Sequence, residues 1–158
     1  MNHQELLNRL IGEWSGTGRG EYPTIESFEY IETLRFTSYN NPFILYEQKT
    51  QRRNEGSSEL LTSHWENGFI HALKSGEIQI NNAQSGGRTE VLTGSLEETE
   101  NGLVLRMQST SFLNDPRMLG TSRVFTIDGD TLHYTMHMRT NSVPEMKFHL
   151  EARLQRTS

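Results

Sequence analysis

After a short N-terminal segment, the chain alternates apolar and polar residues with a period of two, and turn residues interrupt this pattern at short intervals. In the stretch SFEYIETLRF, for example, Phe28, Tyr30, Leu34 and Phe36 share one face. A period of two is typical of a β-strand with one buried face. Strands of even length that follow one another through tight turns predict an all-β, up-and-down antiparallel barrel.

We expect about ten strands, which makes the barrel wide enough to hold a ligand. The segments between strands are rich in the residues that tight turns favour. No linker, repeat or low-complexity segment divides the chain, so residues 1–158 are expected to form a single domain. The expected turns are Asn40-Asn41, Lys74-Ser75-Gly76, Gly86-Gly87, Glu100-Asn101-Gly102 and Asp128-Gly129-Asp130.

The N-terminal segment has a different period. Between residues 3 and 11 the leucine and isoleucine side chains recur at helical spacing, which predicts one short helix. Asn2 is expected to cap this helix together with Glu5, three residues further on. No second helical region follows.

Composition limits what the protein can bind. Only 33% of the residues are hydrophobic, which favours a barrel with a partly polar or ligand-filled interior. The net charge of −5 and the scattered basic residues argue against a nucleic-acid partner. The chain has no cysteine, which excludes disulfides and thiol chemistry. Neither a signal peptide nor a membrane-spanning run is visible, so we expect a cytoplasmic protein without a membrane partner.

The stretch GEWSGTGRGEYPTI, residues 12–25, places Gly16, Gly18 and Gly20 on one face. A dinucleotide-binding loop would need a strand before the glycines and a helix after them, whereas here the order is helix and then strand. Nucleotide binding is therefore rejected. Two explanations remain open: the strand bends sharply where the barrel closes, or a flat ligand approaches its backbone.

The same stretch resembles the nitrobindin family. Gly12, Trp14, Gly16 and Gly18 match the pattern G-x-W-x-G-x-G, and GEYPTI continues the likeness. Further similarities are HWENGF at 64–69, the hairpin AQSGGRTEVLTG and the last strand HLEARLQR, so the resemblance covers nearly the whole chain. It implies a barrel that binds haem b. It further implies ferric haem that binds nitric oxide and isomerises peroxynitrite to nitrate.

The resemblance also implies the site residues. His149 matches the axial ligand of the iron, but strand alternation alone sends it outward with Lys147 and Glu151, away from an apolar core. Two explanations would bring it inward. Either the mixed face of the strand is the cavity wall, or a bulge after Pro144 resets the alternation.

The other implied cofactor contacts are less specific. His64 matches a pocket-lining histidine, and its alternative is a rim residue bonded to Glu66. Arg117 stands where the family usually has lysine and is a candidate counter-charge for the haem propionates. The alternative for Arg117 is a solvated loop arginine. Thr24 is a candidate hydrogen-bond donor to the cofactor, and its alternative is a plain turn residue. Gly16 and Gly18 are candidates for close approach to the cofactor, and their alternative is a bent strand.

The remaining histidines are assigned to the surface or left open. His3 is expected to be solvated, His133 and His137 fall on the outer face of their strand, and His71 stands where the family commonly has arginine. Two alternative functions fit the same sequence: a non-enzymatic carrier of a fatty acid or other apolar molecule, and a barrel that has lost its haem site. The candidate protein partner is a second copy of this chain, in a homodimer.

Overall fold

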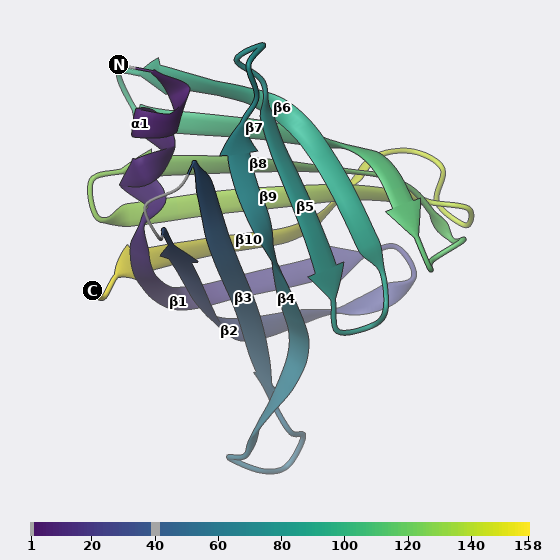
Figure 1. Ribbon diagram of the computed structural model, residues 1–158. Helices are drawn as coiled ribbons and strands as arrows, with labels where there is room; N and C mark the ends of the chain where they lie inside the picture. The colour runs from purple at the N-terminus through teal and green to yellow at the C-terminus, as the bar shows by residue number, and fades with distance from the viewer. Residues whose placement is uncertain (1, 39–41) are drawn as a thin grey trace.

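The computed structural model of the protein describes residues 2–38 and 42–158, which form a closed antiparallel barrel of ten strands with one short helix (Figure 1). This confirms the fold class expected from the alternation and the turns. The strands are β1 (Gly12–Tyr22), β2 (Ile25–Thr37), β3 (Phe43–Arg53), β4 (Leu60–Ala72), β5 (Ile78–Gln84), β6 (Thr89–Thr99), β7 (Gly102–Leu113), β8 (Met118–Asp128), β9 (Thr131–Thr140) and β10 (Lys147–Arg156).

Each strand pairs with its neighbours in the sequence, and β1 closes the barrel by pairing with β10. In this closing ladder Gly16 lies opposite Leu154 and Gly18 lies opposite Ala152. The expected turn at Gly86-Gly87 is present, where the Gly87 N–H donates a hydrogen bond to the carbonyl of Gln84. The expected turn at Asn40-Asn41 lies outside the described residues.

The helix α1 spans His3–Leu7 and has the expected cap. The Asn2 side chain accepts a hydrogen bond from the backbone N–H of Glu5, and the Glu5 carboxylate accepts one from the backbone N–H of Asn2. These reciprocal bonds satisfy backbone donors that a helix start leaves unpaired. Among the described residues, no helix has the length and apolar character needed to cross a membrane.

The helix is shorter than the expected span of 3–11. A 3-10 turn, Asn8–Leu10, follows it, and Ile11 lies outside both elements. The indole Nε1 of Trp14 donates a hydrogen bond of 2.9 Å to the carbonyl of Leu10, so a side chain of β1 satisfies one of the last carbonyls. Leucines from this segment and Trp14 belong to one buried cluster. The segment itself lies across one end of the barrel (Figure 1).

The barrel interior changes from apolar to polar along its length. Along β5 the buried side chains are first Ile78 and Ile80 and then Asn82 and Gln84, away from the helix. This agrees with the partly polar interior expected from the low hydrophobic content. The buried polar residues are Glu32, Gln48, Thr50, Glu66, Asn82, Gln84, Glu90, Thr121 and Arg123.

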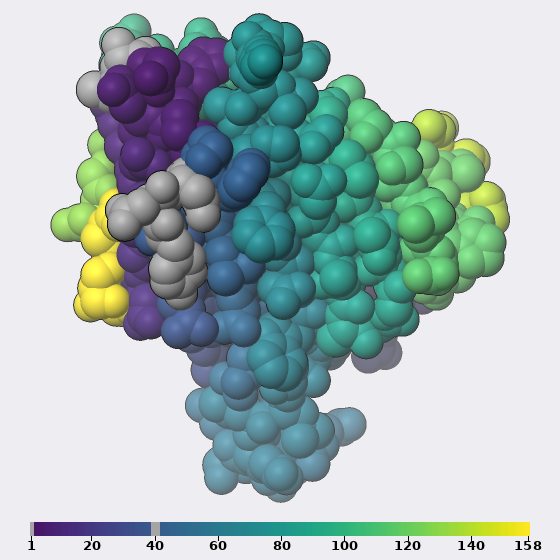
Figure 2. All heavy atoms as spheres, in the orientation of Figure 1, coloured from purple at the N-terminus to yellow at the C-terminus, as the bar shows by residue number. Residues whose placement is uncertain are grey.

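β2 and β3 are paired along only part of their length. Their ladder begins at Ile31, opposite Gln51, whereas β2 itself begins at Ile25. Beyond that point β3 continues with β4 as a hairpin that extends away from the barrel (Figure 1) and projects from the body of the molecule in the space-filling view (Figure 2). The separation leaves a groove beside the first half of β2.

Candidate functional site

A cavity of about 230 Å3 lies in the polar part of the barrel, at the end away from the helix. Its wall combines aromatic and apolar side chains with a small set of charged and amide groups, as ligand pockets commonly do. The lining residues are Phe28, Tyr30, Gln48, Thr50, Arg52, Ser63, His64, Glu66, Gln84, Arg88, Arg123, Phe125, Tyr134, Met136, His149 and Leu150.

His149 lines this cavity because β10 contains a bulge. Phe148 pairs with His137 and Leu150 pairs with Met136, so His149 is the extra residue between two ladder positions. Phe148 therefore stays on the outer face, under the guanidinium of Arg19, while both His149 and Leu150 reach the cavity. Of the two explanations considered for this strand, the structure contains the bulge.

The imidazole of His149 is arranged to present one nitrogen as a free base. Its Nδ1 lies 3.1 Å from the carbonyl oxygen of Glu21, which can only accept, so Nδ1 carries the proton and Nε2 keeps its lone pair. Burial lowers the pKa of His149 below its ordinary value and keeps the ring neutral. The rings of Tyr22 and Phe28 pack edge-on against it. Nε2 has no hydrogen-bond partner among the described residues.

His64 is held by a buried carboxylate. Its Nε2 lies 3.0 Å from Oε1 of Glu66, whose side chain is only 1% exposed. Arg123 binds the other oxygen of Glu66 at 2.7 Å and Glu90 at 2.6 Å. Burial by itself would raise the pKa of Glu66, but the Arg123 charge and the hydrogen bond from His64 hold it well below its ordinary value. The expected contact between His64 and Glu66 is therefore present, on β4 and at the cavity wall.

A second buried carboxyl group, that of Glu32, is protonated and uncharged at neutral pH. The Tyr134 hydroxyl donates a hydrogen bond to its Oε1, and Tyr134 also bonds the Tyr30 hydroxyl. Its Oε2 has no hydrogen-bond partner among the described residues. Burial raises the pKa of Glu32 to about 8, with the hydrogen bonds from Tyr134 and Gln48 acting in the opposite direction. The interior of the barrel thus holds one carboxylic acid beside an ion-pair network.

The glycine face of β1 is covered by the rings of β2. A Cβ atom on Gly18 would overlap the Tyr30 ring, and one on Gly20 would overlap the Phe28 ring. A Cβ on Gly16 would instead meet the backbone carbonyl of Arg153 on β10. The missing side chains therefore make room for two aromatic rings and for close approach of β10.

Arg117 and Thr24 lie outside the cavity wall. Arg117 is 79% exposed and binds Asp115 through Nε at 3.0 Å and through a terminal nitrogen at 3.1 Å. Asp115 also contacts Arg88 at 3.4 Å, and Arg88 does line the cavity. Thr24 is an exposed residue of the turn between β1 and β2.

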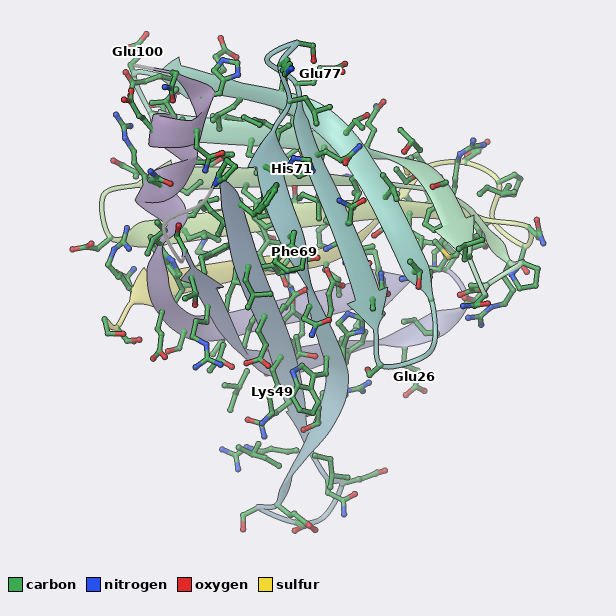
Figure 3. All side chains as sticks on the ribbon, viewed as in Figure 1. Glu26, Lys49, Phe69, His71, Glu77 and Glu100 are labelled. Atoms are coloured by element: carbon green, nitrogen blue, oxygen red, sulfur yellow. The ribbon has the colours of Figure 1, made fainter. Side chains whose placement is uncertain are left out.

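The remaining histidines also lie elsewhere. His71 contacts Phe43 and Gln79 and is seen near Phe69 on the outer side of β4 (Figure 3). His133 lies 2.9 Å from the carboxylate of Glu151 on the barrel exterior, and His137 packs against Phe148 there, as expected. His3, which was expected to be solvated, instead contacts the carbonyl of Gly76 and is partly buried.

Several cavity residues were not singled out from the sequence. Arg52 follows Gln48 and Thr50 on the inward-facing positions of β3, so the period of two already marks it. Phe28 was placed on the apolar face of its strand but not in a site. Arg88 and Arg123 carry no comparable signal, because their roles depend on strands that are distant in the sequence.

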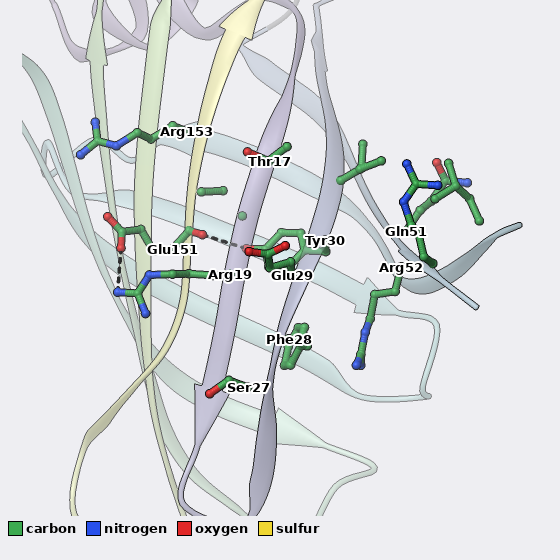
Figure 4. Close-up of a pocket in the computed structure, with 15 residues that line it drawn as sticks. Thr17, Arg19, Ser27, Phe28, Glu29, Tyr30, Gln51, Arg52, Glu151 and Arg153 are labelled. Atoms are coloured by element: carbon green, nitrogen blue, oxygen red, sulfur yellow. Dashed lines mark hydrogen bonds and ion pairs between the residues drawn. The ribbon is translucent and has the colours of Figure 1, made fainter. Parts of the chain in front are cut away.

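A groove of about 790 Å3 adjoins the cavity beside the first half of β2 (Figure 4). Phe28, Tyr30 and Arg52 line both the groove and the cavity, so these three side chains form the boundary between them. Figure 4 shows Arg52 facing Phe28 across this gap. The guanidinium carbon of Arg52 lies 4.3 Å from the centre of the Phe28 ring.

The chain is similar over nearly its whole length to proteins named peroxynitrite isomerases. The chain is 34% identical over 157 residues to peroxynitrite isomerase 2 of Mycobacterium ulcerans, which covers 98% of this chain and 94% of that protein. It is 35% identical to peroxynitrite isomerase Rv2717c of Arabidopsis thaliana, over 95% of this chain and 86% of that one.

Solved structures show the same architecture. The crystal structure of Rv2717c from M. tuberculosis superimposes with a TM-score of 0.85 at 30% identity and covers 98% of this chain and 96% of its own. A phycobiliprotein lyase from Guillardia theta shares the fold alone, with a TM-score of 0.66 and 9% identity over 100% of this chain and 94% of its own. The family of THAP4-like, heme-binding β-barrel domains matches residues 4–156, and this chain belongs to it.

Proposed function

We propose that this protein binds one haem b at the end of the barrel away from the helix, where Nε2 of His149 would be the protein ligand of the iron. The observation that carries the proposal is the hydrogen bond between His149 Nδ1 and the Glu21 carbonyl. It selects the tautomer that a metal requires, and histidine ligands in metalloproteins almost always have such a partner on the second nitrogen. The chain has no cysteine to compete for that role.

The free nitrogen of His149 fits a haem iron, but the cavity alone is too small for the whole cofactor. Pockets that hold drug-sized ligands measure about 300–1,000 Å3, so the cavity of about 230 Å3 is small for a porphyrin. The adjoining groove of about 790 Å3 supplies the missing volume if the Phe28 ring moves off its boundary position. Phe125, Met136 and Leu150 line the cavity and would offer apolar contacts to the porphyrin. We therefore propose that the Phe28 ring is displaced when haem binds.

The relatives' names suggest the reaction, the isomerisation of peroxynitrite to nitrate. When bound, ferric haem would supply a Lewis acid for the peroxo oxygen of peroxynitrite, so no side chain of this chain is required as general base. His149 would hold the iron through its free Nε2. His64, oriented by Glu66, lines the same cavity and is the polar side chain that would contact a small ligand bound there.

Rapid mixing of peroxynitrite with the haem-loaded protein tests the reaction. Peroxynitrite should decay faster than with free haem at matched iron concentration, and nitrate should account for the product. Equal decay rates would reject the isomerase and leave haem binding alone. The alternative function, a carrier of an apolar molecule, predicts that the protein does not shift the Soret band of added haem.

A further inference from the structure

The cavity wall carries three arginines, and two of them are neutralised by carboxylates. Arg123 lies between Glu66 and Glu90, and Arg88 contacts Asp115. Arg52 has no carboxylate partner among the residues that the structure describes; its guanidinium instead stacks on the Phe28 ring at 4.3 Å. An unpaired, exposed guanidinium at the mouth of a cavity is free to bind an anion.

The position of Arg52 follows from β3. Gln48 and Thr50 occupy the inward-facing positions before it and are buried, and the alternation directs Arg52 to the same face. β2 has already separated from β3 at this level, because their ladder ends at the pair Ile31 and Gln51. The side chain therefore reaches across the gap toward Phe28 and lines both the groove and the cavity (Figure 4).

We propose that Arg52, at the boundary between groove and cavity, binds a propionate carboxylate of the porphyrin. The inference rests on the proposed haem site and names a contact within it. In the free protein the guanidinium covers the Phe28 ring. When the porphyrin enters, the propionate replaces the ring as the partner of the guanidinium, and Phe28 moves from the boundary between groove and cavity.

Arg117 is a weaker candidate for this contact. Its guanidinium already makes two bonds to Asp115, and it is absent from the walls of both the cavity and the groove. A propionate would have to compete with a carboxylate that is in place. At Arg52 a propionate competes only with a cation–π contact, which is weak at exposed sites.

Two porphyrins and two matched variants test the proposal. Hemin has two charged propionates, and its dimethyl ester carries neutral methyl esters in their place. They are titrated into the wild type, Arg52→Gln and Arg53→Gln, with the Soret band as the measure of affinity. Arg53 also lines the groove but not the cavity, so its variant removes the same charge from the neighbouring position. Far-ultraviolet circular dichroism of each apo protein verifies folding.

We expect the wild type to bind hemin about tenfold more tightly than the ester, as the loss of one charge-assisted hydrogen-bonded pair implies. Arg52→Gln should remove most of this preference, and Arg53→Gln should keep it. A preference that survives Arg52→Gln would overturn the assignment of Arg52 while leaving haem binding intact. Failure of the wild type to bind either porphyrin would overturn both this inference and the proposed function.

Discussion

Nδ1 of His149 on β10 lies 3.1 Å from the carbonyl oxygen of Glu21 on β1, and this contact ties the proposed iron ligand to the strand that closes the barrel. Glu21 follows the last glycine of β1 and lies between Gly20 and Tyr22, where the pairing of β1 with β2 shifts register. The bulge at His149 lies across from it. Two local departures from regular pairing thus meet at the residue on which the proposed function depends.

The pKa of His149 gives a prediction for pH. Because burial lowers this pKa in the folded state, the unfolded chain binds more protons as the pH falls below about 6.5. His149 therefore contributes stability that is present above that pH and is lost as the pH falls through its folded pKa. An NMR titration of the apo protein should give His149 a pKa below the ordinary value of a histidine. A His149 pKa above 6.5 would contradict the neutral tautomer assigned here.

Glu32 predicts the opposite dependence. Its pKa of about 8, against an ordinary value of 4.5, means that the folded protein retains a proton which the unfolded chain releases. The stabilisation that Glu32 contributes to the folded state is complete below pH 4.5. It decreases by at most about 5 kcal/mol as the pH rises to 8. Glu32→Gln keeps an acceptor for Tyr134 without the ionisation. It should raise the melting temperature increasingly between pH 5 and 8 and leave it nearly unchanged at pH 4.

The control for this change is Glu26→Gln, at an exposed position of β2. It should shift the melting temperature little at any of these pH values. If the difference between wild type and Glu32→Gln is the same at pH 4 and pH 8, then Glu32 does not hold the proton assigned to it.

Gly18→Val tests why β1 is rich in glycine. The new side chain would overlap the Tyr30 ring, so we expect a loss of about 1–3 kcal/mol in the stability of the apo protein. Thermal unfolding measures it, and Gly86→Val is the control because no atom lies within 4 Å of a Cβ at that turn. Unchanged apo stability with weakened haem binding would instead favour direct approach of the ligand to the glycine backbone.

His64→Leu separates haem binding from reactivity. The proposed ligand of the iron is unaffected, so the Soret band should form as in the wild type. Peroxynitrite decay should slow by about tenfold, the effect of losing one hydrogen bond of about 1.5 kcal/mol to the reacting ligand. An unchanged rate would assign His64 to packing against Glu66 alone.

The architecture followed from the sequence because turns and alternation are local properties. The cap formed by Asn2 and Glu5 is local too, and it is confirmed. The early end of the helix was missed: the α-helix ends at Leu7, and a 3-10 turn continues to Leu10, whose carbonyl accepts a hydrogen bond from Trp14. Alternation also gave the outward position of His133 correctly.

The site was harder to predict because it depends on contacts between distant strands. Nothing in the residues around His149 distinguishes a bulge from a regular strand; only pairing with β9 reveals it. Arg123 and Glu66 are 57 residues apart in the sequence, so their ion pair has no local pattern. The separation of β2 from β3, which exposes Phe28 and Arg52 to the groove, is likewise a property of the closed barrel.

The central claim is that His149 binds the iron of one haem, and a haem titration of the wild type and His149→Ala tests it most directly. The wild type should show a Soret band that saturates at one haem per chain. His149→Ala should lose that ferric spectrum while its far-ultraviolet circular dichroism stays unchanged. A His149→Ala protein whose haem spectrum and stoichiometry equal those of the wild type would contradict the account.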